Sequence, residues 1–209
     1  MDPSIHDTER TLVSSHNFAF QADPLPPRAV PAFEPFGGLS PADFKLAFRN
    51  HPAGVAVITA DAGDGPVGLT ATSVFSVSAE PPLLVFSLSD QSSSTPTIRA
   101  ADTVVVHLLG SDQLKIAQLC ATSGIDRFAD TSLWDRLETG EPYFPSAHAW
   151  IRGRVINRMS AGSSTVVAVH ALESRITEDT EASAPLVYHN RTWHRLGAHS
   201  EIATGLVRT

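Results

Sequence analysis

Short apolar runs separated by Gly, Pro, Asp and Ser dominate the chain from residue 54 onward. The runs are rich in β-branched residues and are bounded by turn residues, which is the pattern of β-strands. The predicted strands cover residues 54–60, 66–77, 83–88, 104–109, 150–159, 165–175 and 186–196. Because few helices separate them and no β-α-β alternation occurs, they predict a closed or nearly closed antiparallel barrel.

One amphipathic helix is predicted before the strands. Residues 40–43 offer a serine N-cap, a proline at the first helical position and an acid in the first turn. Phe44, Ala47 and Phe48 follow at helical spacing, and Pro52 ends the pattern. Two more short helices are predicted, one opening at Thr95-Pro96 and one capped by Ser111.

A hairpin is predicted near the end of the chain. A two-residue turn at Asn190-Arg191 pairs Tyr188 with Trp193, so that the two aromatic rings share one face. His189 lies on the other face. We expect His189 and His194 on opposite faces of this hairpin, and the chain has no H-E-x-x-H motif, so no metal site is predicted.

The chain ends differ from this pattern. Five prolines fall between residues 24 and 35, so residues 1–38 are predicted to form a Pro-rich tail, or an arm that lies along a partner subunit. Residues 39–197 are then the folded domain, and residues 198–209 a C-terminal tail. The start of the chain has no basic and apolar leader, which predicts a cytoplasmic protein.

Composition narrows the classes of partner. The 209 residues include 15 basic and 22 acidic ones, a formal net charge of −7. This balance argues against nucleic acid or an anionic membrane as a partner. Cys120 is the single cysteine, which excludes an intrachain disulfide. No apolar run is long enough to span a bilayer.

Two motifs bear on phosphate binding. Residues 63–68 match G-x-G-x-x-G, but a β-rich segment follows instead of a helix, so these glycines are predicted to form a hairpin turn. Residues 87–96 are rich in hydroxyls and lead into a helix start. They fit either a phosphate cradle or an ordinary polar turn with an N-cap, and Arg99 is the only cation close in sequence.

Residues 68–86, together with residues 51–59, resemble the short-chain flavin reductases. The segment beginning at Thr72 reads T-S-x-x-S-x-S-x-x-P-P-L and is followed by the serine-rich loop. The resemblance continues through residues 92–94, 126–129 and 185–196, and so covers roughly residues 40–197. It implies a mainly β fold, the antiparallel, Greek-key-like FMN-binding split β-barrel with a few short helices.

The resemblance also implies a function. These proteins are NAD(P)H:flavin oxidoreductases that supply reduced flavin to a separate flavin-dependent monooxygenase. It implies a homodimer, FMN (FAD being possible) as cofactor, and NADH or NADPH as co-substrate. The positions that match flavin contacts are Gly68, Leu69, Thr70, Ala71, Thr72, Ser73, Ser87, Leu88, Ser89, Ser92, Ser93, Ser94, Thr95, Cys120, Arg127, Phe128, His189 and Trp193.

Roles follow from the same resemblance. Residues 70–73 are expected along the isoalloxazine edge and residues 87–89 along the ribityl chain. Ser92 and Ser94 are expected to hold the phosphate, with Arg127 and Phe128 approaching from their loop.

The chain departs from the family pattern at one place. Many members carry Gly-Asp-His before the last long strand, whereas this chain reads Gly162-Ser163-Ser164. Hydride transfer needs positioning more than a proton donor, so reductase activity is still expected, with His189 or His148 as replacements and no catalytic residue assigned. A non-catalytic FMN-binding carrier or sensor is the alternative, followed by an oxidase of the pyridoxamine-phosphate type.

Overall fold

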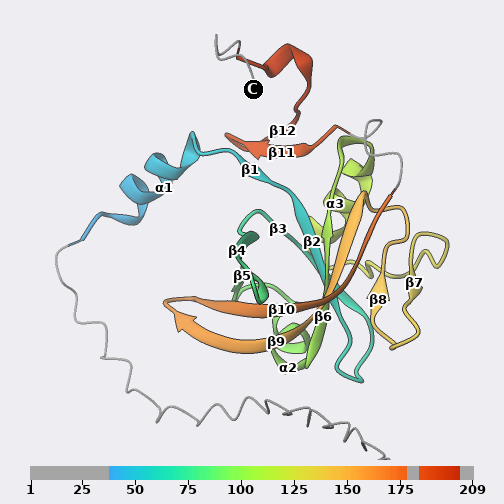
Figure 1. Cartoon of the computed structure of the whole chain (residues 1–209). Coiled ribbons are helices and arrows are strands. Elements are labelled where there is room, and N and C mark those ends of the chain that lie inside the picture. The colour runs from blue at the N-terminus through green and yellow to red at the C-terminus, as the bar shows by residue number, and fades with distance from the viewer. Residues whose placement is uncertain (1–37, 178–183, 203–209) are drawn as a thin grey trace, which may run out of the picture. The chain divides into compact units, whose positions relative to one another are not determined.

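A computed structural model describes residues 38–177 and 184–202 (Figure 1). The predicted N-terminal arm therefore lies outside the described residues except for Gly38, and so does most of the predicted C-terminal tail. The division of the chain into arm, domain and tail stays a prediction.

A seven-stranded antiparallel sheet with the order β3-β2-β6-β9-β10-β5-β4 is the main feature (Figure 1). Its strands are β2 (Ala56–Ala60), β3 (Val67–Ala71), β4 (Phe75–Ala79), β5 (Pro82–Ser89), β6 (Thr103–Leu108), β9 (Ala149–Ala161) and β10 (Ser164–Ile176). The mainly β, antiparallel class is confirmed. In the part of the chain that is described, no ladder joins the edge strands β3 and β4, so a closed barrel is not observed.

The prediction of one strand over residues 66–77 is wrong, because the chain crosses there from one edge of the sheet to the other. Ala71 is the last residue of β3 and pairs with Ala56, whereas Phe75 begins β4 and pairs with Val85. Between the two strands, Ser73 Oγ accepts a hydrogen bond from the Ser87 N–H at 3.1 Å. A side chain thus takes the place of a backbone ladder, which periodicity alone does not reveal.

A second sheet contains β1 (Ala53–Gly54), β11 (Leu186–His189) and β12 (Thr192–Arg195) in the order β1-β11-β12. The predicted hairpin register is confirmed, with Tyr188 opposite Trp193. Asn190 and Arg191 have φ values of 47° and 63°, as a two-residue hairpin turn of this twist requires. A small third sheet pairs β7 (Asp135–Arg136) with β8 (Pro142–Tyr143), and neither strand was predicted.

The expected placement of His189 and His194 on opposite faces is wrong. His189 pairs with Thr192 and His194 with Val187, so alternation along each strand places both histidines on the same face. Their ring centroids are 5.5 Å apart. They are diagonal neighbours across the hairpin rather than direct partners, which counting residues across the turn misses.

The predicted first helix is confirmed as α1 (Pro41–Arg49), where Ser40 Oγ accepts the Asp43 N–H at 3.1 Å. None of its residues is buried. The predicted cap at Ser111 is wrong: Ser111 is the first residue of a short 3-10 turn, and the Gln113 side chain accepts the Gly110 N–H at 2.7 Å. The other helices are α2 (Thr95–Ala100), η1 (Ser111–Gln113), α3 (Leu114–Ala121) and η2 (Ala198–Ser200).

Two apolar clusters lie on either side of β2, which explains why all five of its residues are buried. Ala56, Ile58 and Ala60 belong to one cluster with the inward residues of β5, β6 and β10. Val57 belongs to the other, which α3 covers. The turn that joins β2 to β3 contains the glycine motif, and Asp61 Oδ1 accepts the N–H groups of Gly63 and Gly65. The hairpin interpretation of that motif is confirmed.

Candidate functional site

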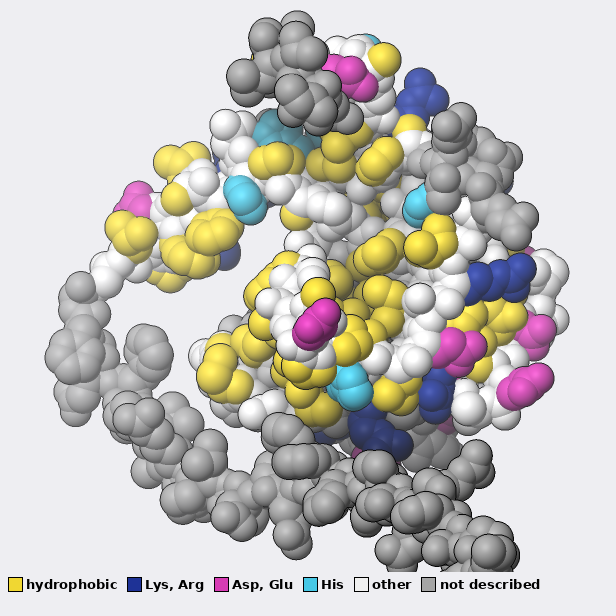
Figure 2. Space-filling view, in the orientation of Figure 1, with side chains coloured by type: hydrophobic (Ala, Val, Ile, Leu, Met, Phe, Trp, Pro, Cys, Tyr) yellow, Lys and Arg dark blue, Asp and Glu magenta, His cyan; other side chains and the backbone are white. Residues whose placement is uncertain are grey.

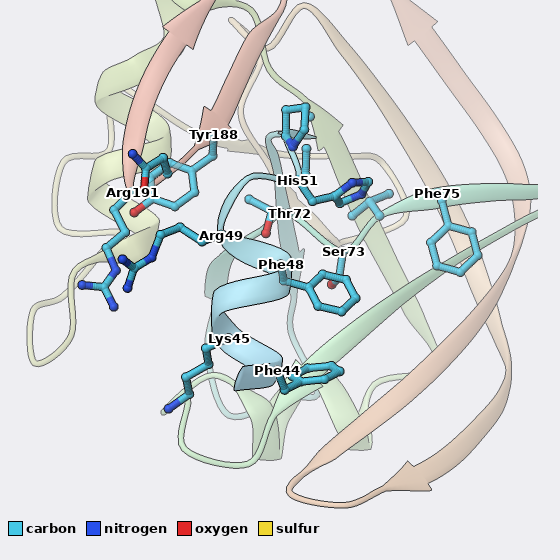
Figure 3. Close-up of a pocket in the computed structure, with 15 residues that line it drawn as sticks. Phe44, Lys45, Phe48, Arg49, His51, Thr72, Ser73, Phe75, Tyr188 and Arg191 are labelled. Carbon is cyan, nitrogen blue, oxygen red and sulfur yellow. The ribbon is translucent and has the colours of Figure 1, made fainter. Parts of the chain in front are cut away.

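A groove of about 780 Å³ lies where the chain crosses between the two edges of the large sheet (Figure 3). Residues 72–75 of the crossing form part of its lining, together with residues of β1 and the β11–β12 turn. The remaining lining comes from α1 and the segment after it. Among the described residues, no strand pairs with the outer edge of β3 or of β4. A flat ligand in the groove can therefore lie against backbone and hydroxyl groups of the crossing.

A second, smaller cavity of about 130 Å³ lies between the serine-rich loop and the loop after α3. Arg127 connects the two loops: its Nη1 donates to Ser94 Oγ at 3.0 Å and to Ser93 Oγ at 3.4 Å. Its Nε and Nη2 both donate to the Thr122 carbonyl, at 3.1 and 2.8 Å. No carboxylate in the described ranges pairs with Arg127, since the neighbouring Asp126 accepts the Phe128 N–H. We call this arrangement of Arg127, Ser93 and Ser94 the cradle.

Ser94 is the buried member of the cradle and holds Arg127 in place. It is only 1% exposed, and its hydroxyl donates to the Gly68 carbonyl at 2.8 Å while it accepts from Arg127. Ser93 and Arg127 are more accessible, and the Ser93 N–H has no hydrogen-bond partner among the residues described. These groups are the donors that an anion would meet.

Arg99, the cation closest to the loop in sequence, is occupied elsewhere. It forms an ion pair with Asp90 and donates to Thr165 Oγ1 at 2.8 Å. The structure therefore assigns the positive charge of the loop to Arg127, which lies 33 residues from Ser94 in sequence.

Strand β3 joins the cradle to the groove. Gly68 lines the small cavity beside the cradle, and a Cβ added there would lie 3.3 Å from Cys120 Sγ and 3.4 Å from the Phe128 ring. Thr72 lies in the groove, four residues later, which is roughly 13 Å along an extended strand. A ligand with a phosphate at one end and a ring at the other would span this distance.

The side chains of the other predicted β3 contacts point elsewhere. Leu69 and Ala71 belong to the sheet core, and the Thr70 hydroxyl donates to the Ala117 carbonyl at 2.6 Å. At these positions only backbone groups are available for a ligand. Thr72 and Ser73 both line the groove.

The serine-rich segment also contains both side chains that lie near the groove and side chains that are buried or hold the turn. Ser87 Oγ lies 3.1 Å from Ser73 Oγ, close to the groove, whereas Leu88 is fully buried in the core. The Thr95 hydroxyl donates to the Ser89 carbonyl at 2.7 Å and is buried. Ser92 Oγ accepts the Ser94 N–H at 3.3 Å, so its side chain shapes the turn.

Cys120, on α3, and Phe128 pack against Gly68 of β3. Both are buried in the cluster under α3, and Phe128 makes an edge contact with Trp134. Burial raises the pKa of the Cys120 thiol to about 12. Cys120 is therefore a packing residue behind Gly68 rather than a nucleophile.

His189 and Trp193 are not among the described residues that line the groove. His189 Nε2 is 2.8 Å from Asn50 Oδ1, which ties β11 to the C-terminal end of α1. Trp193 packs against Tyr188, with ring centroids 4.8 Å apart, and Tyr188 faces the groove. His148, the other predicted replacement histidine, contacts neither cavity.

Sequence reasoning missed several groove residues. Lys45, Arg49, His51 and Arg191 line it, yet no role was predicted for them. A signal was present in the sequence for Arg191 alone, because the predicted two-residue turn requires a left-handed backbone there, which is unusual for arginine.

Across residues 38–177 and 184–202, no three His, Cys, Asp or Glu side chains gather as metal ligands would. None of the helices in the described part has the length and apolarity needed to cross a membrane.

Comparison with known proteins decides the family. Residues 48–197 match the family model described as "Flavin reductase like domain". The chain belongs to the flavin reductase-like family. Among this family's curated members, the NADH:FMN oxidoreductase of Rhodococcus qingshengii is 43% identical over 188 residues, covering 88% of this chain and 93% of that protein.

Two further members place the chain within the flavin reductases. The reductase component of the FADH(2)-dependent resorcinol hydroxylase of Rhizobium sp. (strain MTP-10005) is 34% identical and covers 71% of this chain and 83% of that protein. The solved structure of a flavin reductase domain protein from Arthrobacter sp. FB24 has a TM-score of 0.70 and 35% identity. It covers 75% of this chain and 95% of the Arthrobacter chain.

Proposed function

We propose that this flavin reductase transfers a hydride from NADH to FMN and supplies reduced flavin to a separate monooxygenase. One observation carries the proposal: β3 joins the cradle, whose arginine has no carboxylate partner among the described residues, to the groove beside the crossing at residues 72–75. The similarity to the Rhodococcus NADH:FMN oxidoreductase and to the Rhizobium reductase component supports it.

The residues of the cradle fit the phosphate of FMN. Among the described residues, no carboxylate pairs with Arg127, so it supplies an uncompensated charge, and Ser93 supplies a hydroxyl and an N–H without a partner there. Ser94 fixes the arginine by accepting its Nη1–H, and the absent side chain at Gly68 lets the loop approach the strand. Charge-assisted hydrogen bonds of this kind are roughly twice as strong as neutral ones.

The groove residues fit the flavin ring and the nicotinamide. Bound FMN supplies the hydride-accepting ring. Thr72 and Ser73 would present hydroxyl and backbone donors to the polar edge of that ring, and Tyr188 would limit the access of water. No side chain needs to move a proton, since this chain's task is to hold two flat rings against each other. FAD shares the ring and the first phosphate, so the same residues fit either flavin.

A homodimer is part of the proposal. Several apolar side chains are more than half exposed on α1, β4 and β9, and Figure 2 shows apolar surface over α1 and the neighbouring strands. Examples outside the groove are Leu46, Val77 and Met159. Exposed apolar surface of this extent favours an interface between subunits. A cytoplasmic location also stays part of the proposal, because the free thiol of Cys120 suits a reducing compartment.

The test is to mix the purified protein with NADH and FMN in air and to follow the loss of NADH absorbance. Turnover that depends on added FMN and saturates with it supports the proposal. The alternative, an FMN-binding carrier or sensor, is favoured by one observation: the turn at Gly162 and Ser163 carries neither acid nor histidine. FMN binding without NADH oxidation would support that alternative and overturn the reductase.

A further inference from the structure

Three cations line the groove, and none of the described residues in its lining is acidic. Lys45 and Arg49 lie on α1, and Arg191 lies in the β11–β12 turn. None of the three forms an ion pair with another described residue, although the chain as a whole has a net charge of −7. Unpaired cations gathered along a concave surface of an acidic protein favour an anionic ligand there.

The three cations mark one side of the groove. Figure 3 shows the side chains of Lys45, Arg49 and Arg191 directed toward the same side, with the rings of Phe48 and Phe75 toward the other. A ligand that fits both sides would have an anionic part and a flat apolar part. The cradle is a different cavity, so the phosphate of FMN does not account for these charges.

The arrangement is held by contacts between segments far apart in sequence. Asn50, the C-cap of α1, lies 2.8 Å from His189 at the end of β11. Arg191 has a φ of 63°, a conformation that favours glycine in such a turn. An arginine at this strained position directs a long cationic side chain to the groove, where glycine would leave none.

We infer that Lys45, Arg49 and Arg191 bind the diphosphate of the nicotinamide dinucleotide, and we call these residues the cationic rim. This inference rests on the proposed function and names its second binding site. A diphosphate carries a negative charge on the oxygens of each of its two phosphoryl groups, which matches a row of cations better than a single one. Anchoring the diphosphate would position the nicotinamide against the flavin ring that Thr72 and Ser73 hold, without the Asp-His pair that this chain lacks.

The experiment replaces each rim residue singly and all three together, as Lys45→Gln, Arg49→Gln and Arg191→Gln. Arg154→Gln is the matched control, because Arg154 is exposed on β9 and lines none of the described cavities. The KM for NADH is measured with FMN present. Binding of ADP-ribose, which contains the diphosphate without the nicotinamide, is measured by calorimetry on the protein without flavin.

The inference predicts that each single variant raises the KM for NADH about three- to fivefold, as exposed charge contacts do, and that the triple variant raises it at least tenfold. ADP-ribose affinity should fall in parallel, while FMN affinity and the Arg154→Gln variant stay unchanged. An unchanged KM in the triple variant overturns the inference. So does weaker FAD binding with normal NADH kinetics, which would assign the rim to the adenylate of FAD.

Failure of the proposed function has a different signature. If the unaltered protein binds FMN and does not oxidise NADH, the reductase proposal fails. The ADP-ribose titration still tests whether the cationic rim binds a diphosphate. An equal loss of ADP-ribose affinity in the Arg154→Gln control would show a long-range charge effect and overturn a local site.

Discussion

Replacing Arg127 by glutamine should weaken FMN binding and leave riboflavin binding unchanged. Arg127 Nη1 contacts both hydroxyls of the cradle, and no acid in the described ranges compensates its charge. A hydrogen bond to a charged group contributes about 1.5–3 kcal/mol. Because Arg127 is partly exposed, screening places the effect in the lower half of that range, so the Kd for FMN should rise about 10- to 40-fold.

The comparison of two flavins makes this prediction sharp. Riboflavin has the same ring and ribityl chain as FMN but no phosphate, so its Kd should change less than about twofold. Quenching of flavin fluorescence measures both affinities. Arg99→Gln is the matched control, since Arg99 is already paired with Asp90 and should leave both Kd values unchanged. Equal weakening of FMN and riboflavin in Arg127→Gln would mean that the arginine only holds the loop at Thr122, and the phosphate assignment would be wrong.

Three more predictions concern stability and reactivity. Gly153→Ala should destabilise the fold by about 3 kcal/mol in urea unfolding, because the new Cβ would lie 2.3 Å from a Val169 methyl and 2.8 Å from a backbone oxygen, whereas Gly54→Ala, with open space, should change little. Burial lowers the pKa of His107 to about 4, so the neutral ring's contribution to stability is complete above pH 6.5 and is lost as the pH falls from there toward 4. The free energy of unfolding should therefore drop by about 2 kcal/mol between pH 7 and pH 5. The His107→Gln variant should lack this part of the pH dependence. Cys120, with its raised pKa, should react with a thiol reagent at least about 100-fold more slowly in the native protein than in urea, and rapid native labelling would contradict its burial.

The hydrogen bonds around His107 agree with that pKa. The Phe144 N–H donates to Nε2 at 3.0 Å, so Nε2 must lack a proton, and Nδ1 then donates to the Val57 carbonyl at 3.0 Å. The neutral ring satisfies both contacts, and a second proton would replace an accepted hydrogen bond with a repulsion.

Local sequence patterns predicted the features that depend on neighbouring residues. The register of the β11–β12 hairpin followed from its two-residue turn, and the start of α1 followed from the Ser40 cap. The glycine turn between β2 and β3 was predicted because the residues after it do not have helical periodicity. In each case the chemistry that decides the structure lies within a few residues.

Features that depend on distant residues were not predictable in this way. The contact between Arg127 and Ser94 spans 33 residues, and the cationic rim joins α1 to a turn about 140 residues later. The crossing at residues 72–74 reads as a continuous strand because its residue types suit β-structure on either side of the break. Family resemblance pointed to whole segments of the chain, and it did not show that Leu69, Ala71 and Leu88 belong to the core.

The most direct test of the account is reduction of FMN by NADH in the absence of oxygen, followed by stopped-flow absorbance of the flavin. The account predicts bleaching of the oxidised flavin at a rate that rises with NADH concentration, that requires the protein, and that slows when the cationic rim is replaced. Bound flavin that stays oxidised under excess NADH would contradict the reductase function and leave an FMN-binding protein without turnover.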